Sequence, residues 1–297
     1  MKSVTKITFT DNDGNKFFGE GPCRLLRCVE KTGSLRAAAM EMEMAYSKAS
    51  RILKQAESAL GYSLTMRSAG GRDGGGSILT LEGKRWLTQY EAYRDACIRA
   101  NQELFRQYFP RIGCVIMASG LGKRFGGNKL LADFHGRPMI SRILDATEGI
   151  FAQRVVVTRS EDVAVLCRNR GIKTILHSLP HRSDTVRLGL EAMPGIDRCM
   201  FATADQPLLR RDTVAALALT AANDSASIWR TIYEGALGSP VVFPKWAFPE
   251  LLNLPEGKGG GVVIKKYPER LRTVSVRDMY ELKDVDSPED LEELLER

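Results

Sequence analysis

The stretch Ile112-Gly-Cys-Val-Ile-Met117 is followed directly by Ala118-Ser-Gly-Leu-Gly-Lys-Arg-Phe-Gly-Gly-Asn-Lys-Leu-Leu131. A short, uninterrupted apolar run such as the first is typical of a strand that is buried on both faces. Comparable runs follow at residues 154–158, 173–176, 199–203 and 240–243, and helical patterns lie between several of them, at 139–151, 162–169, 185–193 and 211–222. This alternation of strand and helix predicts an α/β fold with a mostly parallel sheet from residue 111 onward.

The composition is that of a folded protein with more than one domain. A chain of 297 residues, at roughly 100–200 residues per domain, suggests two domains. Hydrophobic residues make up 43% and charged residues 27%, which excludes a disordered or fibrous chain. No apolar run approaches the ~18 residues that a membrane span needs, and no signal peptide is visible at the start. We therefore expect a cytoplasmic protein without a membrane partner.

The cysteines and histidines give no metal or disulfide pattern. The six cysteines are scattered without a C-x-x-C pair, and none of the three histidines is spaced with Cys or Glu as in a metal motif. Reduced, mostly buried thiols are expected, and a zinc enzyme is not.

The first third of the chain has the plan of a helix-turn-helix. Residues 6–18 are expected to form a β-hairpin around Asp11-Asn-Asp-Gly-Asn15. A helix over 23–31, a helix stop and N-cap at 32–34, a short helix over 35–40 and a longer helix over 46–60 follow. Short helix, tight turn and longer helix favour a DNA-binding motif, although two packed helices of any small bundle give the same pattern.

A glycine-rich segment next to these helices favours a winged form of the motif. Residues 67–76 contain five glycines and two arginines, and 77–80 read as a strand, so we predict a basic hairpin, or wing. A nucleotide-binding glycine loop fits less well, because no apolar strand precedes it and no Lys-Ser/Thr follows it. A long helix from residue 80 to 108 ends before Pro110, which places the domain boundary at 110–111.

The excess of positive charge is concentrated in this first domain. Residues 1–110 carry 17 basic against 12 acidic side chains, and residues 111–297 carry 26 against 24. A basic first domain permits a polyanionic partner such as duplex DNA, although it does not by itself establish one.

The glycine-rich loop after residue 117 is predicted to bind a polyphosphate. Glycine-rich backbone after a parallel strand presents N–H groups to an anion, and Lys123, Arg124 and Lys129 add cationic side chains around it. The loop is not a Walker A motif, because no Ser/Thr follows the lysine at the required spacing.

Three aspartates are candidates for binding Mg²⁺. Asp205 follows the strand expected at 199–203, and ligands of open α/β sheets bind outside the carboxyl ends of the strands. Asp284 and Asp286 lie on one face of an extended segment, before a helix start at Ser287-Pro-Glu-Asp290 that explains the next residues without a function. Asp205 and one of this pair could share a hard cation, although Asp205 could also be a simple capping residue.

Six sequence blocks, in order, resemble the molybdenum-cofactor nucleotidyltransferases of the MobA/MocA type. They are the glycine-rich loop with Arg124 and Lys129-Leu-Leu, Arg182-Ser-Asp-Thr-Val-Arg187-Leu-Gly-Leu, Asp205-Gln-Pro-Leu, Gly238-Ser-Pro-Val-Val-Phe, Gly257-Lys-Gly-Gly, and Asp284-Val-Asp-Ser-Pro-Glu-Asp-Leu. The resemblance implies a Rossmann-like nucleotidyltransferase domain over residues 111–297.

The resemblance also implies roles for individual residues. Arg124, Lys129 and Asp205 would be catalytic, with Asp205 and Asp284 or Asp286 as metal ligands. The nucleotide would be held by Ala118, Ser119, Gly120, Leu121, Gly122, Lys123, Thr185 and Arg187. Cytidylyltransferases of this type usually read Ala-Ala-Gly and guanylyltransferases Ala-Gly-Gly where this loop reads Ala118-Ser-Gly, whereas Lys129-Leu-Leu looks more like the cytidylyl branch.

Residues 1–108 resemble the winged helix-turn-helix domain of the molybdate-responsive ModE-type regulators. The matching text includes Thr32-Gly-Ser-Leu-Arg-Ala-Ala38 and the glycine-rich segment with the Leu79-Thr-Leu-Glu-Gly83 that follows it. The resemblance implies a homodimer that binds duplex DNA with the helix from Tyr46 in the major groove. The expected contacts are Ser47, Lys48, Ser50 and Arg51 on that helix, and Arg67 and Arg72 on the wing.

The leading hypothesis is a bifunctional chain. Its second domain would use Mg²⁺ to transfer a nucleotidyl group, CMP rather than GMP, from an NTP to molybdopterin or its metal complex, with release of pyrophosphate. The first domain would bind DNA or serve for dimerisation. Two alternatives stay open: a transcription regulator whose transferase domain is a ligand sensor, and a transferase that acts on another small phosphate.

Overall fold

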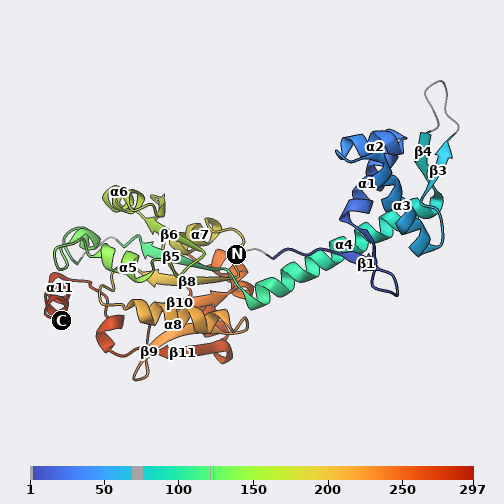
Figure 1. Cartoon of the computed structure of the whole chain (residues 1–297). Helices are drawn as coiled ribbons and strands as arrows, with labels where there is room; N and C mark the ends of the chain where they lie inside the picture. Colours follow the sequence, from blue (N-terminus) through green and yellow to red (C-terminus); the bar gives the residue numbers. More distant parts are fainter. Residues whose placement is uncertain (1–2, 69–75, 121, 123) are drawn as a thin grey trace. The chain divides into compact units, whose positions relative to one another are not determined.

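The computed structural model describes residues 3–68, 76–120, 122 and 124–297 (Figure 1). The chain divides into two compact units, Met1–Phe105 and Arg106–Arg297. The helix α4 (Leu81–Tyr108) contains the point where one unit ends and the other begins. Among the described residues, no helix is long and apolar enough to cross a membrane.

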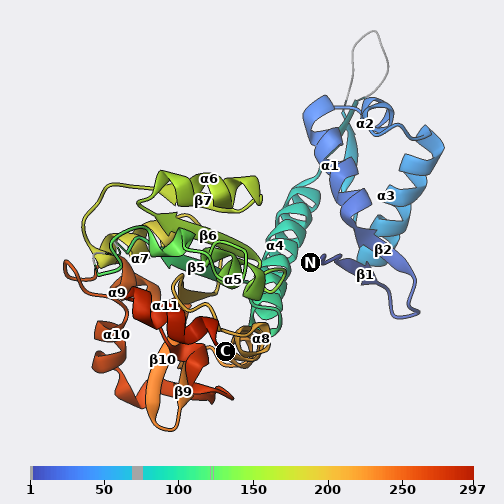
Figure 2. The same cartoon turned by 90° about the vertical axis from the view of Figure 1, so that its left-hand side faces the viewer.

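The first unit begins with the expected hairpin. Strands β1 (Thr8–Thr10) and β2 (Lys16–Gly19) pair antiparallel, and Phe9 lies opposite Phe18. The Asp11 carboxylate shapes the turn by accepting the N–H groups of Asp13 at 3.0 Å and Asn15 at 2.8 Å. Figure 2 shows this hairpin beside the helices of the first unit.

The helix-turn-helix and its wing are also confirmed. Helices α1 (Glu20–Thr32), α2 (Leu35–Glu41) and α3 (Tyr46–Leu60) precede the antiparallel pair β3 (Thr65–Ser68) and β4 (Gly76–Leu79). The Ser34 hydroxyl accepts the N–H of Ala37 and so caps α2, as the sequence predicts. Fully buried Leu25, Leu26 and Leu64 hold these elements on one core. The wing residues 69–75, with the predicted phosphate contact Arg72, lie outside the described part.

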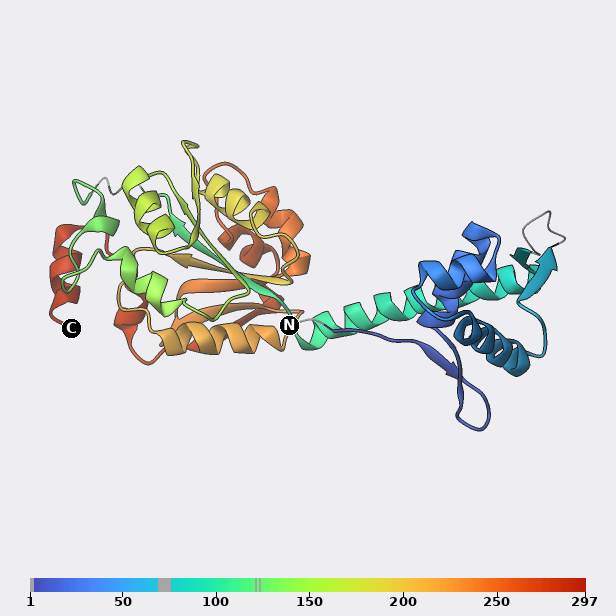
Figure 3. The ribbon, with the colours of Figure 1, turned by 45° about the horizontal axis from the view of Figure 1, so that its top comes forward.

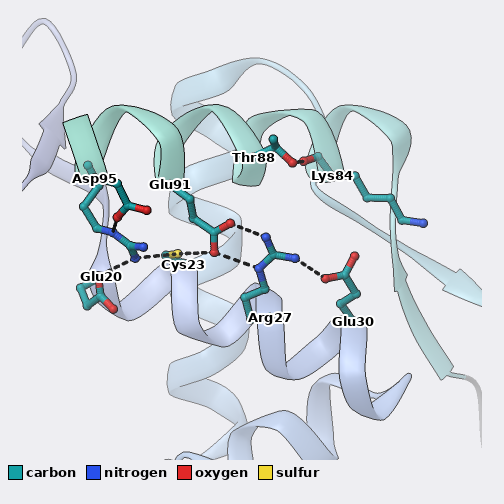
Figure 4. Close-up of polar contacts among 9 residues, drawn as sticks. Glu20, Cys23, Arg27, Glu30, Lys84, Thr88, Glu91 and Asp95 are labelled. Carbon is teal, nitrogen blue, oxygen red and sulfur yellow. Dashed lines mark hydrogen bonds and ion pairs between the residues drawn. The ribbon is translucent and has the colours of Figure 1, made fainter. Parts of the chain in front are cut away.

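Charged side chains join α1 to α4 on the surface of the first unit (Figure 4). The Arg27 Nε–H donates to Glu91 Oε1 at 2.9 Å, and its Nη1–H donates to Glu30 Oε2 at 2.7 Å. These contacts hold the pKa of Glu91 below its ordinary value, because Arg27 stabilises the charged form. The two helices are thus fixed to each other beside the core that they share.

Gly83 allows α4 to pack directly on the backbone before the wing. A Cβ added at Gly83 would lie 2.1 Å from the carbonyl oxygen of Leu64. We expect Gly83→Ala to destabilise the first unit by about 1–3 kcal/mol, because the helix must move away from a backbone atom. Gly21→Ala, in α1 and with no atom within 4 Å of the added Cβ, is the control. Urea denaturation checks this, and equal midpoints for the two variants would contradict it.

The second unit is built on a seven-stranded sheet in the order β11-β9-β10-β8-β5-β6-β7. Its strands are β5 (Ile112–Ala118), β6 (Gln153–Thr158), β7 (Lys173–Leu176), β8 (Arg198–Thr203), β9 (Ile228–Tyr233), β10 (Ala236–Pro244) and β11 (Leu271–Ser275). The neighbours β8, β5, β6 and β7 are parallel, and β10 runs antiparallel to both β8 and β9. The predicted mostly parallel α/β sheet is therefore confirmed.

Helices cover both faces of this sheet (Figure 3). The helical elements are η1 (Lys129–Leu131), α5 (Ile140–Ala146), α6 (Glu161–Asn169), α7 (Arg182–Glu191), α8 (Arg211–Ala222), η2 (Lys245–Ala247), α9 (Phe248–Leu252), α10 (Gly261–Lys266), η3 (Pro268–Arg270), η4 (Met279–Leu282) and α11 (Pro288–Leu295). In β5, Cys114 and Ile116 face the core under α5, α6 and α8, while Val115 faces the core under α7, α9 and α10. Burial on both faces explains the unbroken apolar run of this strand.

Two departures from the sequence expectations concern the sheet and the first helix of the second unit. Strands β9 and β11 were not expected, because Arg230 and Arg272 interrupt their apolar residues; they pair in parallel beyond β10. The helix expected over residues 139–151 is shorter, since α5 ends at Ala146 and the Thr147 hydroxyl donates to the Ile143 carbonyl. Gly149 then adopts a positive φ of 69°, which directs the chain away from the helix.

Candidate functional site

A cavity of about 430 Å³ lies where the strands β5, β6 and β8 end. Its lining comprises Met117, Ser119, Gly120, Arg159, Pro180, His181, Arg182, Thr185, Thr203, Asp205, Asp284 and Asp286. The carboxyl ends of parallel strands meet at one edge of a sheet, so the topology brings together segments that are far apart in sequence. Six residues predicted to bind the nucleotide or the metal line this cavity: Ser119, Gly120, Thr185, Asp205, Asp284 and Asp286.

The loop after β5 needs glycine for its shape. Gly122 has a φ of 55°, and an added Cβ would lie 2.4 Å from the Gly127 carbonyl oxygen. Gly126 also has a positive φ, of 74°. The two glycines therefore allow sharp turns of the backbone between the end of β5 and Lys129. Leu121 and Lys123, which we expected at the nucleotide, lie outside the described residues.

Ser119 is engaged with the neighbouring strands. Its hydroxyl donates to the Val157 carbonyl at 3.1 Å, and its oxygen lies 2.9 Å from His177 Nε2. Burial and the charge of Arg159 lower the pKa of His177. Because the Ser119 hydroxyl already donates to Val157, its oxygen is free to accept from a His177 Nε2–H. The Arg159 Nε–H donates to the Ser119 carbonyl at 3.0 Å. The serine at this position is thus held on both its side chain and its backbone.

Lys129 lies between two of the predicted metal ligands. Its ammonium donates to Asp205 Oδ2 at 2.7 Å, to Asp286 Oδ1 at 2.9 Å and to the Val285 carbonyl at 2.6 Å. The side chain is only 8% exposed. Burial alone would lower the pKa of Lys129, but Asp205 and Asp286 raise it above its ordinary value, so the amine stays charged. The expected contact of Lys129 with a triphosphate is thus accompanied by an ion-pair network within the protein.

The acidic groups around Lys129 repel one another. Part of Asp284 is exposed to solvent. The loss of water around the rest of its carboxyl group, and then the charges of Asp205 and Asp286, raise its pKa to about 6. The Val285 N–H donates to the Asp205 carbonyl at 2.9 Å, which ties the two acidic segments together. A bound cation would reduce this repulsion between the carboxylates.

The donors present fit a hard divalent cation. Asp205 Oδ1 is buried and has no hydrogen-bond partner among the described residues. Carboxylate oxygens are the ligands that Mg²⁺ and Mn²⁺ prefer, and an unpaired buried one is costly without a cation. In this arrangement of side chains, the described part of the chain gathers no three metal-binding groups into one cluster. Asp205, through its unpaired Oδ1, and Asp284 are therefore the candidate ligands, whereas Asp286 lies near cations with both oxygens, Oδ1 with Lys129 and Oδ2 with Arg124.

The remaining predicted residues differ in their placement. Thr185 is 2% exposed and lines the cavity. Arg124 is largely exposed, with its Nη1 3.8 Å from Asp286 Oδ2. Arg187 does not line the cavity; it pairs along α7 with Asp184 at 3.3 Å and Glu191 at 3.6 Å.

Two arginines of the cavity were given no role from the sequence. Arg159 follows the end of β6, as Asp205 follows the end of β8, so its position after a buried strand was an available signal. Arg182 begins α7 and was part of a matching block without an assigned function. Ala118, the last residue of β5, is buried, and its carbonyl accepts the Thr158 hydroxyl at 3.0 Å.

The first unit presents the predicted DNA contacts on α3. Ser47, Lys48 and Arg51 are exposed and Ser50 is partly buried. A groove of about 950 Å³ runs along this face of α3 and the turn of the β1–β2 hairpin; Ser47, Ser50, Arg51, Lys54 and Lys16 are among its lining residues. Arg67 of the wing is exposed.

The comparison with protein families agrees with this geometry. The sequence model of the MobA-like NTP transferase domain matches residues 114–271, more than half of the chain. This chain belongs to the MobA-like NTP transferase family. The match covers the glycine-rich loop and Asp205, and it ends before Asp284.

A second family model matches the first unit. It describes the bacterial regulatory helix-turn-helix proteins of the lysR family and covers residues 23–84. The resemblance to ModE-type regulators is corrected accordingly: the matching motif is of the lysR type. Short helix, turn, recognition helix and wing are a plan that different regulators share, so these elements alone do not separate the types.

The similar curated proteins are 3-deoxy-manno-octulosonate cytidylyltransferases. The protein from Neisseria meningitidis is 41% identical over 61 residues, which are 20% of this chain and 24% of that protein. The one from Acinetobacter baumannii is 33% identical over 110 residues, 35% of this chain and 43% of that protein. The chain thus spans about a quarter to less than half the length of these relatives.

Solved structures share the fold of the MobA-like NTP transferase domain. Rv0371c from Mycobacterium tuberculosis H37Rv has a TM-score of 0.57 and 22% identity, over 63% of this chain and 99% of that one; it has also been solved with manganese, at a TM-score of 0.53. CMP:2-keto-3-deoxy-manno-octonic acid synthetase, solved with CTP, has a TM-score of 0.52 and 16% identity, over 63% and 96% of the two chains.

Proposed function

We propose that the second unit transfers a cytidylyl group from CTP to the phosphate of an acceptor, molybdopterin or its metal complex, and releases pyrophosphate. The observation that carries this proposal is the cavity that unites Ser119 and Gly120 of the glycine-rich loop with Asp205 and Asp284. Backbone N–H groups for an anion and carboxylates for a cation are the two requirements of nucleotidyl transfer.

The transfer depends mainly on the positioning of the two substrates and on the neutralisation of phosphate charge. An oxygen of the acceptor phosphate attacks the α-phosphorus of CTP in line, and the bond to the β-phosphate oxygen breaks. Asp205 and Asp284 would hold a divalent cation, Mg²⁺, which neutralises charge on the phosphates when bound. Lys129 would neutralise charge when Asp205 turns to the metal, and Arg124, which is exposed and lies near Asp286, would approach the triphosphate.

Two features support cytidine over guanosine. The similar curated proteins are cytidylyltransferases, and one structural neighbour was solved with CTP. In addition, Lys129-Leu-Leu131 resembles the cytidylyl branch of the family. The test is to titrate each of the four NTPs, with Mg²⁺, by calorimetry. CTP is expected to bind most tightly, and preferential binding of GTP would reverse the assignment of the base.

We also propose that the first unit binds duplex DNA, as a homodimer, through the exposed face of α3. The groove that α3 lines with the β1–β2 turn, with Arg51, Lys54 and Lys16 around it, supports this role. The alternative, a regulator whose transferase domain only senses a ligand, predicts nucleotide binding without pyrophosphate release.

DNA binding should depend on salt and on α3. We expect log K to fall with log salt by about −0.9 for each phosphate contact, because bound counterions are released. Lys48→Ala and Arg51→Ala should relax sequence preference, whereas Arg72→Ala should weaken all sequences alike. Gel-shift titrations of the full chain against its own promoter region and unrelated DNA measure this.

Arg99→Ala, on the exposed surface of α4, serves as the control. Absence of any retardation at low salt would leave the first unit as a dimerisation module only.

A further inference from the structure

A second, smaller cavity of about 110 Å³ adjoins the candidate active site. The two cavities share Met117 and Arg182 in their linings, so they are neighbours. The smaller cavity is walled by apolar side chains, among them Phe201 and Phe243, whose rings meet edge to face at 5.9 Å. Both rings are buried, at 7% and 2% exposure. Buried aromatic rings therefore form an apolar wall next to the candidate nucleotide site.

Two guanidinium groups, Arg182 and Arg230, also line this cavity. Arg230 comes from the middle of β9, where its Nε–H donates to the Gly238 carbonyl at 2.5 Å. Among the described residues, neither arginine has a carboxylate in ion-pair contact, and the Arg182 guanidinium makes no hydrogen bond, whereas other arginines of the second unit, such as Arg137 and Arg170, pair with Asp145. Arginine without an acidic partner, at an apolar wall, is the residue that usually binds a phosphate or carboxylate ligand.

The electrostatics of the pair point the same way. Burial, and then the charge of Arg182, lower the pKa of Arg230 below its ordinary value. Two like charges on one small cavity oppose each other until an anion neutralises them. The fold nevertheless brings the two arginines together, because the start of α7 and the middle of β9 both line this cavity. Gly259 leaves room for Arg182, since a Cβ at Gly259 would lie 3.2 Å from the Arg182 Nε.

We propose that Arg182 and Arg230 bind an anionic group of the acceptor substrate, with its flat apolar portion against Phe201 and Phe243. This inference rests on the proposed nucleotidyl transfer and names the chemistry of the acceptor side. A cavity of 110 Å³ has the volume of about three to four water molecules in the liquid, which suits an anionic group with the apolar atoms next to it rather than a whole nucleotide. The rest of the acceptor then extends into the larger cavity, toward Asp205.

The test uses the full chain and three small probes without metal: phenyl phosphate, benzoate and the uncharged phenol. Calorimetry or ligand-observed NMR gives their dissociation constants. We expect an aromatic anion to bind and phenol not to, and the better of phenyl phosphate and benzoate identifies the acceptor group. Arg182→Gln and Arg230→Gln should each weaken that anion by about tenfold or more, because each removes a charged hydrogen bond, while Arg230→Lys should lose less.

The controls separate this site from general charge and from the nucleotide. Arg272→Gln removes an exposed arginine from β11, the strand beside β9, and should leave anion binding unchanged. Arg230→Gln should leave CTP binding unchanged. Thermal melting verifies folding. Arg182→Gln keeps the test valid if Arg230→Gln does not fold, since no hydrogen bond or ion pair among the described residues involves the Arg182 guanidinium.

The inference is overturned if neither anion binds the wild type, if Arg182→Gln binds it as the wild type does, or if Arg230→Gln weakens CTP as much as the anion. Pyrophosphate release from CTP is measured separately in the wild type. Anion binding that depends on both arginines, without any CTP turnover, would therefore defeat the proposed function and leave this site in place.

Discussion

Asp205→Ala is expected to lower pyrophosphate release by about 100-fold or more, with little change in the stability of the fold. The variant removes the buried Oδ1 that has no hydrogen-bond partner among the described residues, and with it the proposed ligand of the divalent cation. Lys129 keeps Asp286 and the Val285 carbonyl as partners, so the local ion-pair network is reduced rather than dismantled. Steady-state assays at saturating Mg²⁺ and CTP measure the effect.

Asp162→Ala is the matched control, because it removes an exposed carboxylate at the start of α6. Its rate should equal that of the wild type. Near wild-type turnover of Asp205→Ala under the same conditions would rule out the metal-binding role of this aspartate.

Lys129→Ala is expected to affect both activity and stability. Its removal leaves Asp205, Asp284 and Asp286 without their shared cation, in a site where Lys129 itself is nearly buried. Breaking a buried pair costs about 3–5 kcal/mol, and we expect about 2–3 kcal/mol here because Asp286 is half exposed and screened by solvent. The apparent CTP requirement should rise and the rate should fall, since less positive charge meets the phosphates.

Addition of Mn²⁺ or Mg²⁺ should stabilise Lys129→Ala more than the wild type, because the cation replaces the missing ammonium. Lys245→Ala, at an exposed position of η2, should change neither the melting temperature nor the CTP requirement. Equal effects of the two lysine substitutions would mean that the site responds to overall charge and not to Lys129.

Local patterns predicted the elements of the fold well where one residue type dominates. The unbroken apolar run of β5, the Asp11 turn and the Ser34 cap each follow from a few neighbouring residues, and all three are confirmed. Strand β9 was missed because the polar residues Arg230 and Thr231 interrupt its apolar residues, and only the partners β10 and β11 make this segment a strand.

The candidate site was harder to predict, because it depends on contacts between distant segments. The position of Asp205 at the end of a strand could be predicted from sequence. That Lys129 would lie against residues 205, 285 and 286 could not, since 76 to 157 positions separate them and a lysine after a glycine-rich loop suggests phosphate binding first. Arg230 could not be predicted for the same reason: it lines its cavity only because the sheet places β9 next to β10, and the sequence does not show this order of strands.

Cytidylyl transfer to a phosphate-bearing acceptor is the activity that we propose for the MobA-like domain of this chain. The most direct measurement incubates the purified full chain with Mg²⁺, molybdopterin and each NTP in turn, follows pyrophosphate and identifies the product by mass. We expect pyrophosphate release with CTP that requires both Mg²⁺ and Asp205, and a product heavier than the acceptor by one cytidylyl group. CTP binding without pyrophosphate release or a new product would contradict it and favour the ligand-sensing regulator.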